Sequence, residues 1–122
     1  MGKRPNVIRD KSFAFALRIV KLFQYLQSEK KEYVLSKQLL RSGTAVGALV
    51  REAEHAESRA DFIHKLAIAQ KEANESIYWL ELLHQSGYME EIQFNSITTD
   101  LIEINKLLAS IIITSKNKKN GK

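Results

Sequence analysis

The chain has 122 residues, 44% of them hydrophobic, and a formal net charge of +5 at pH 7. This length gives room for one domain, 1–122, with a hydrophobic core. The chain has no cysteine, which excludes disulfides, thiolate zinc sites and cysteine nucleophiles and fits a cytoplasmic location. A polar N-terminus and short apolar runs predict neither a signal peptide nor a membrane span.

Four helices are predicted, because the chain contains a single proline and shows helical periodicity between short polar breaks. They span about residues 11–27, 34–56, 59–85 and 92–115, with basic tails at 1–9 and 116–122. Short connections favour up-down-up-down packing of neighbouring helices. The expected fold is therefore all-α, an antiparallel four-helix bundle.

Residues with capping properties stand at several of these boundaries. Asp10 or Ser12 is the expected N-cap of the first helix. Ser58, with Asp61 three residues later, resembles a capping box before the third helix. Gly87 fits a left-handed C-cap that ends the third helix.

Two of the predicted helices carry more apolar surface than a lone bundle covers. The apolar arc of the first helix is about 220° wide, whereas a bundle helix needs a stripe of little more than ~100°. Excess apolar surface usually marks an interface, so we expect a homo-oligomer. The candidate interface residues are Ile68, Glu72, Glu75, Trp79, Leu82, Phe15, Ile19 and Phe23. The alternative for Trp79 is a half-buried rim position within the monomer.

Carboxylates on an apolar helix face must pair with a cation or shift their pKa. Glu72 and Glu75 stand in this position on the third helix. Lys65, Arg41 and Arg51 are the cations that could pair with them across a subunit contact. We favour such a structural ion pair over a catalytic dyad.

The second helix contains two glycines one turn apart, Gly43 and Gly47, among other small residues. Each glycine costs about 1 kcal/mol of helix propensity relative to alanine. Their presence indicates close approach of another helix, inside or between bundles, or alternatively a flexible kink.

A di-iron carboxylate site is the sharpest enzymatic hypothesis for a four-helix bundle. Two Glu-x-x-His spacings are present, Glu52-His55 and Glu81-His84. At 1.5 Å rise per residue they lie about 30 Å apart along the bundle, too far to share a metal. Hydrolase and phosphate-loop motifs are also missing, so we predict no enzymatic activity, cofactor, metal or small-molecule substrate.

The positive charge is concentrated at the two ends of the chain. Residues 1–11 carry +3 and residues 116–122 carry +4, which leaves −2 of the total of +5 for residues 12–115. Such ends are often only solvated, but repeated in an oligomer they would bind RNA or DNA with avidity. The candidate nucleic-acid contacts are Lys3, Arg4, Arg9, Lys11, Lys116, Lys118, Lys119 and Lys122.

The centre of the chain carries a recognisable combination of motifs. YVLSKQLLRSGTAVGA spans residues 33–48 and leads into Glu52-Ala53, RADFIHKL spans residues 59–66, and Tyr78-Trp79-Leu80 follows Glu75. In these motifs the chain resembles, over about residues 10–115, the bacterial four helix bundle protein family, also called the 23S rRNA intervening-sequence protein or S23 family.

The resemblance implies four-helix subunits assembled in a homo-oligomeric ring, a pentamer, without an established enzymatic activity. A related protein, the accessory variability determinant of diversity-generating retroelements, is a basic ring that binds RNA and a reverse transcriptase. We therefore expect a non-enzymatic oligomeric scaffold, associated with nucleic acid as an adaptor. An RNA-binding accessory factor of a reverse transcriptase is the alternative, and a metal-dependent helical-bundle enzyme is the remote one.

Overall fold

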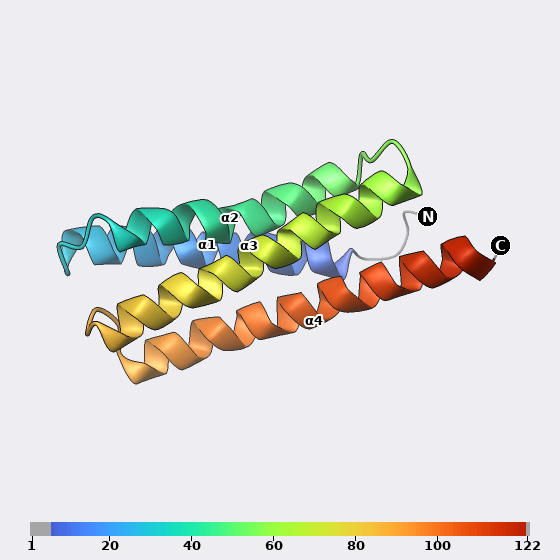
Figure 1. Ribbon diagram of the computed structural model, residues 1–122. Coiled ribbons are helices and arrows are strands. Elements are labelled where there is room, and N and C mark those ends of the chain that lie inside the picture. Colours follow the sequence, from blue (N-terminus) through green and yellow to red (C-terminus); the bar gives the residue numbers. More distant parts are fainter. Residues whose placement is uncertain (1–5, 122) are drawn as a thin grey trace.

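A computed structural model, which describes residues 6–121, consists of four helices (Figure 1). They are α1 (Val7–Ser28), α2 (Leu35–Ala53), α3 (Arg59–Gln85) and α4 (Glu91–Gly121). No strand occurs in the described residues, so the all-α prediction is confirmed. The three connections lie at alternate ends of the molecule, and neighbouring helices run in opposite directions (Figure 1).

Each helix packs on two neighbours around a single core. The contact between α2 and α3 is the most extensive, and the contact between α1 and α4 is the least extensive. The core side chains recur at three- and four-residue spacing, as an amphipathic helix requires. The largest fully buried apolar members are Phe15, Ile19, Leu26, Leu39, Val46, Leu66, Leu80, Leu83, Leu101, Ile104 and Leu108.

The two glycines of α2 face α1. A Cβ atom built on Gly43 would lie 2.9 Å from Cγ1 of Ile19, and one built on Gly47 would lie 3.3 Å from the carbonyl oxygen of Ser12. Real Cβ atoms essentially never approach other atoms as closely as the first of these distances. The glycines therefore permit close packing of α1 against α2 inside the bundle.

The outer ends of α1 and α4 differ from the predicted ones. Asn6 is the N-cap of α1, and its Oδ1 accepts a hydrogen bond from the backbone N–H of Arg9 at 3.2 Å. Asp10 and Ser12, the expected caps, lie inside the helix. At the other end, α4 continues to Gly121, so most of the predicted tail 116–122 is helical. This segment has no proline, and its only glycine is Gly121, so nothing ends the helix earlier.

Both expected caps of α3 are confirmed. Oγ of Ser58 accepts a hydrogen bond from the backbone N–H of Asp61 at 3.0 Å. Gly87 has a φ of +88°, the left-handed conformation, and its N–H donates to the carbonyl of His84 at 3.1 Å. The N–H of Tyr88 donates to the carbonyl of Leu83 at 2.9 Å. These two bonds form a Schellman motif, which ends α3 and turns the chain toward α4.

Replacing Gly87 with Ala is expected to lower the free energy of unfolding by about 1 kcal/mol, because an L side chain is strained at this φ. Urea denaturation measures the change. Ser86→Ala at the preceding exposed position is the control, with an expected change below about 0.5 kcal/mol. Equal stabilities of the two variants would contradict the strain.

The N-terminus of α2 is capped by a residue that the sequence did not single out. The Glu32 carboxylate accepts hydrogen bonds from the backbone N–H groups of Val34, Leu35 and Ser36 at 3.0, 2.8 and 2.7 Å. In return, Oγ of Ser36 donates to the carbonyl of Glu32 at 2.9 Å. Burial raises the pKa of Glu32, but the three backbone donors outweigh it and the net pKa is lowered. The ionised carboxylate therefore stabilises the fold.

Glu32→Gln is expected to lower the free energy of unfolding by about 1–2 kcal/mol at neutral pH, because a neutral amide oxygen is a weaker acceptor for three donors. The pKa of Glu32 is lower in the folded than in the unfolded chain. Its contribution is therefore complete above the unfolded pKa of about 4.3 and is lost as pH falls through the folded value. Urea titrations of both proteins between pH 7 and pH 3 should show the difference shrinking in acid. A constant difference would contradict this role of the charge.

Candidate functional site

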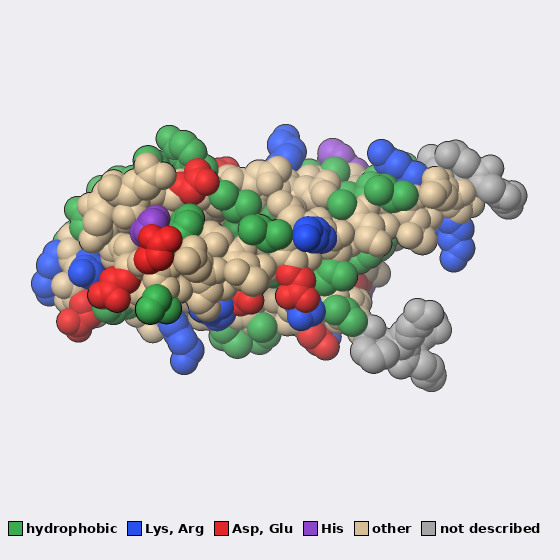
Figure 2. Space-filling view, turned by 90° about the horizontal axis from the view of Figure 1, so that it is seen from below, with side chains coloured by type: hydrophobic (Ala, Val, Ile, Leu, Met, Phe, Trp, Pro, Cys, Tyr) green, Lys and Arg blue, Asp and Glu red, His purple; other side chains and the backbone are tan. Residues whose placement is uncertain are grey.

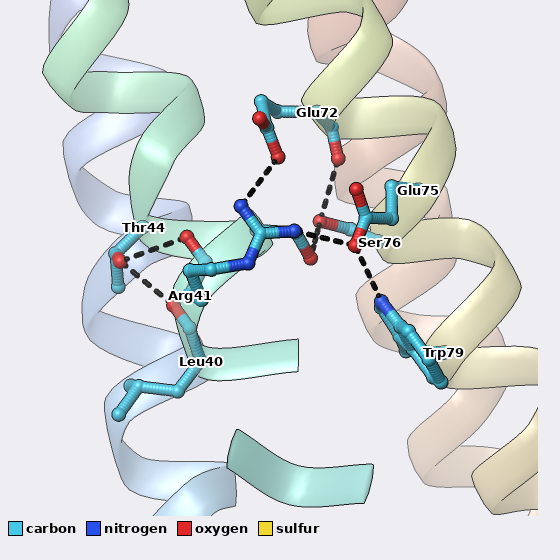
Figure 3. A network of polar contacts seen from close by, with 8 residues as sticks. Leu40, Arg41, Thr44, Glu72, Glu75, Ser76 and Trp79 are labelled. Carbon is cyan, nitrogen blue, oxygen red and sulfur yellow. Dashed lines mark hydrogen bonds and ion pairs between the residues drawn. The ribbon is translucent and has the colours of Figure 1, made fainter. Parts of the chain in front are cut away.

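A network of charged and aromatic side chains joins α2 to α3 on the outer surface of the bundle (Figure 3). Nη1 of Arg41 lies 3.2 Å from Oε1 of Glu72, and Nη2 of the same guanidinium donates to Oε2 of Glu75. The indole Nε1 of Trp79 donates to the same oxygen of Glu75 at 2.9 Å. Arg41 thus bridges two carboxylates, one of which also holds the indole ring in place.

A buried pair of hydroxyl groups lies near this network. Oγ of Ser42 and Oγ of Ser76 are 2.8 Å apart, and both residues are fully buried. Oγ of Ser76 also donates to the carbonyl oxygen of Glu72 at 2.9 Å. Because buried polar groups are costly unless they are hydrogen-bonded, this pair fixes the register of α2 against α3.

The network has the electrostatics of a structural ion pair. Hydrogen bonds from Trp79 and then from Arg41 lower the pKa of Glu75. The hydrogen bond to Glu75 raises the pKa of Arg41. A carboxylate with a lowered pKa stays ionised at neutral pH, and its oxygens already accept two donors. It is poorly suited to deliver or remove a proton.

The cations that we expected to act across a subunit contact have partners inside the chain. Arg41 lies opposite Glu72 and Glu75 because α2 and α3 are antiparallel neighbours. Nζ of Lys65 lies 3.1 Å from Oε1 of Glu52. The guanidinium of Arg51 lies 5.3 Å from the ring centre of Phe13, a cation–π distance.

The prediction that two particular residues lie at a subunit interface is wrong. Phe15 and Ile19 are 1% and 0% exposed and belong to the core. The wide apolar arc of α1 misled the prediction, because a helix in a bundle packs against two neighbours as well as the centre. Phe23, Ile68, Leu82 and Trp79 are half-buried. Their place in an interface stays a prediction.

Helix α1 carries two large apolar side chains on its exposed side. Phe13 and Leu17, one turn apart, are 51% and 49% exposed. Phe13 also lines a hollow of about 230 Å³, together with small residues, among them Ala16 and Ala48, and with Arg51. We call these five residues the α1–α2 strip. Sequence periodicity placed apolar side chains here but did not separate them from the core.

A second hollow lies between α1 and α4, the pair with the least contact. Its volume is about 340 Å³. We call it the α1–α4 groove, and it is lined by Arg18, Lys21, Leu22, Tyr25, Met89, Gln93 and Ile97. None of these residues was predicted as a site residue from the sequence. The four residues from α1 lie within two turns of that helix, but only the packing of α4 shows that they face one hollow.

Two of the predicted nucleic-acid contacts form ion pairs with acidic residues of the same bundle. Nε of Arg9 lies 3.1 Å from Oε2 of Glu54, and Nζ of Lys11 lies 3.1 Å from Oε2 of Glu103. These residues belong to α1 rather than to a tail, since the helix begins at Val7. They therefore meet acidic residues at the C-cap of α2 and within α4, which corrects their assignment to a free basic end.

The C-terminal cations extend the last helix. Lys116 and Lys118 are exposed, and the backbone of Lys119 is helical. Lys3, Arg4 and Lys122 lie outside the described residues.

On the side of the molecule shown in Figure 2, hydrophobic side chains are scattered among acidic and basic ones and form no continuous patch.

The residues of the two Glu-x-x-His spacings make contacts within the bundle. His84 stacks on Phe94 with ring centres 4.4 Å apart, and its Nε2 lies 3.3 Å from Oε1 of Glu91. Glu52 of the other Glu-x-x-His spacing holds Lys65. Within the part of the chain that the structure describes, no group of three or more His, Asp and Glu side chains could hold a metal ion.

Comparison with known proteins identifies the family. Residues 4–110 match the model of the 23S rRNA-intervening sequence protein family. The chain belongs to the 23S rRNA-intervening sequence protein family. It is similar to a protein of unknown function from the S23 ribosomal protein family of Bacteroides thetaiotaomicron VPI-5482, whose crystal structure was determined at 1.70 Å resolution. The two are 62% identical with a TM-score of 0.87, over 88% of this chain and 96% of that chain. No curated protein matches.

Membership of the 23S rRNA-intervening sequence protein family confirms the resemblance seen in the sequence. Neither this family nor its structural relative of unknown function indicates an enzymatic activity. In the described residues, no helix combines the length and the hydropathy that crossing a membrane requires.

Proposed function

We propose that this member of the 23S rRNA-intervening sequence protein family is a non-enzymatic protein, an up-down-up-down four-helix bundle whose copies assemble into a ring. The ring is a pentamer that works in the cytoplasm as a scaffold and as an adaptor for nucleic acid. The observation that carries the assembly is the α1–α2 strip, where Phe13 and Leu17 are about half exposed on one helix.

The α1–α2 strip has the features of a subunit contact. The large side chain of Phe13 lines a hollow together with small residues, including Ala16 and Ala48, so a helix of another subunit can pack closely there. The stacking of Arg51 on Phe13 orders the edge of the strip before any partner arrives. An interface that presents different surfaces on its two sides closes into a ring when the rotation between subunits allows it.

Light scattering coupled to size exclusion tests the assembly. We expect the wild-type protein to be a discrete oligomer at micromolar concentration. Leu17→Asp should dissociate it, because a buried unpaired carboxylate is costly at an interface, while circular dichroism stays helical. Lys106→Asp, at an exposed position of α4, is the control and should keep the wild-type mass. A wild-type monomer would overturn the proposal.

The nucleic-acid part rests on the exposed cations at the end of α4. Each subunit presents Lys116 and Lys118, and a ring multiplies them. We expect RNA binding that weakens steeply as salt rises, because cations that neutralise phosphates release counterions. Fluorescence anisotropy with a labelled RNA at two or more salt concentrations measures this. Undetectable binding at low salt would contradict the adaptor role and leave the assembly proposal standing.

A further inference from the structure

We infer that the α1–α4 groove binds an unpaired nucleobase together with its phosphate, on a single-stranded nucleic acid. The inference rests on the proposed adaptor function and places a contact on the body of the bundle, away from the basic end of α4. It follows from the size of the groove, its lining and its charge.

The groove has the size and the apolar floor of a site for a base. Its volume of about 340 Å³ falls within the range of small-ligand sites, about 300–1,000 Å³. Leu22, Met89 and Ile97 are buried core residues that close its floor. Tyr25 is partly buried against the core and lines the groove, so its ring is held in place as a stacking surface. Bases in single strands are commonly stacked on such aromatic rings.

The lining of the groove includes two cations, Arg18 and Lys21, and no carboxylate, and only Arg18 is paired with a carboxylate from outside the lining. The guanidinium of Arg18 is fixed by Asp100 of α4, with Nη1 to Oδ2 at 2.6 Å, and by the hydroxyl of Ser96, with Nη2 to Oγ at 2.9 Å. Lys21 is exposed and has no carboxylate partner among the described side chains. Lys21 can therefore neutralise a phosphate next to a base in the groove.

Gln93 favours a base over an acidic apolar segment of a protein. Its Oε1 accepts a hydrogen bond from the backbone N–H of Glu90 at 3.1 Å, at the start of α4. This bond orients the side-chain amide, whose NH₂ group can donate to a carbonyl or ring nitrogen of a base. An aromatic ring, an amide donor and a cation together match a nucleotide. An acidic helix of a protein would use only the apolar floor and the cation, so it does not account for the aromatic ring and the amide donor.

The test measures binding of a fluorescein-labelled ten-nucleotide uridine RNA by anisotropy, using the full chain. Tyr25→Leu should weaken binding by at least about fivefold, because aliphatic bulk keeps the packing but loses base stacking. Tyr25→Phe is the matched control and should bind within about twofold of wild type. Lys21→Gln should reduce the slope of log affinity against log salt by about 0.7, the value for one phosphate on a single strand. Lys71→Gln, at an exposed lysine of α3, should leave that slope unchanged.

Two further probes test whether the groove needs an unpaired base, and a mapping experiment locates the bound RNA on the protein. A DNA decamer of deoxyuridine should respond to the variants as the RNA does, whereas an RNA duplex should be insensitive to Tyr25→Leu because its bases are paired. With 4-thiouridine in the RNA, photo-cross-links should map to residues 18–25 or 89–97.

Several results would overturn the groove inference. If Tyr25→Leu and Lys21→Gln bind as wild type and cross-links map only to the end of α4, the groove assignment fails while the adaptor function stands. If the two variants change the subunit number by light scattering and leave RNA affinity intact, a second copy of the chain fills the groove. If an acidic apolar peptide displaces no RNA but binds in a Lys21-dependent way, the site is for protein. If the wild-type protein binds no RNA, both the groove inference and the proposed adaptor function are contradicted.

Discussion

Replacing Phe15 with Ala is expected to lower the free energy of unfolding by about 3–5 kcal/mol. The side chain is 1% exposed and lies in the core beside other fully buried residues of the bundle. Removing the ring loses its transfer free energy and leaves a cavity that close-packed helices fill only in part. Urea denaturation, followed by circular dichroism at several protein concentrations, separates this loss from any effect on assembly.

Leu17→Ala is the matched control, because Leu17 lies on the same helix but is 49% exposed. We expect it to change the stability of the subunit by less than about 1 kcal/mol. Phe15 was predicted from the sequence to lie at a subunit interface. If Phe15→Ala dissociated the oligomer and left the stability of the subunit unchanged, that placement would be right and the core assignment wrong.

The helices themselves were predictable because their signals are local. Periodic apolar residues and polar breaks gave four segments whose inner boundaries lie close to the observed ones. The caps at Ser58 and Gly87 use residue types with a strong positional preference. Glu32 was missed because it caps α2 from outside the usual N-cap position, through a carboxylate that three backbone groups share.

The surfaces were harder to predict, because they depend on how helices pack. Periodicity shows that α1 is apolar over a wide arc but cannot say which part faces α2, α4 or solvent. Phe15 and Phe13 are two residues apart, yet the first is buried and the second exposed. An ion pair at Glu72 and Glu75 was expected from their apolar surroundings. Arg41 was among the expected cations, but only the packing of α2 on α3 shows that it pairs with both carboxylates within the same chain.

The excess of positive charge at the ends of the chain was counted correctly from the sequence. The structural place given to two of those cations was wrong. Counting residues placed Arg9 and Lys11 in a basic tail. The bundle instead brings Glu54 and Glu103 to them, because α1 begins early enough to carry both cations into contact with its neighbours. Exposed pairs of this kind contribute little stability, about 0–1 kcal/mol each, but they withdraw the two cations from other partners.

Gly43→Val is expected to lower the free energy of unfolding by about 1–3 kcal/mol, although valine has a better helix propensity than glycine. Even a Cβ atom at this position would meet three atoms of the Ile19 side chain at 2.9, 3.1 and 3.2 Å. Ile19 is fully buried and β-branched, so it has no free space and few rotamers with which to move aside. The two helices must separate, which weakens the contact along α1 and α2.

A double-mutant cycle tests whether this steric conflict is the cause. Ile19→Ala alone should cost about 2–5 kcal/mol, because it leaves a cavity opposite Gly43. The two γ-methyl groups of valine fill part of that cavity, so the double variant should be more stable than the sum of the single effects predicts, by about 1 kcal/mol or more. Gln38→Val, at an exposed position of α2 outside the α1–α2 strip, is the control for the β-branched residue and should change stability by less than about 0.5 kcal/mol. Strictly additive effects of Gly43→Val and Ile19→Ala would show that the glycine serves some purpose other than close approach to Ile19.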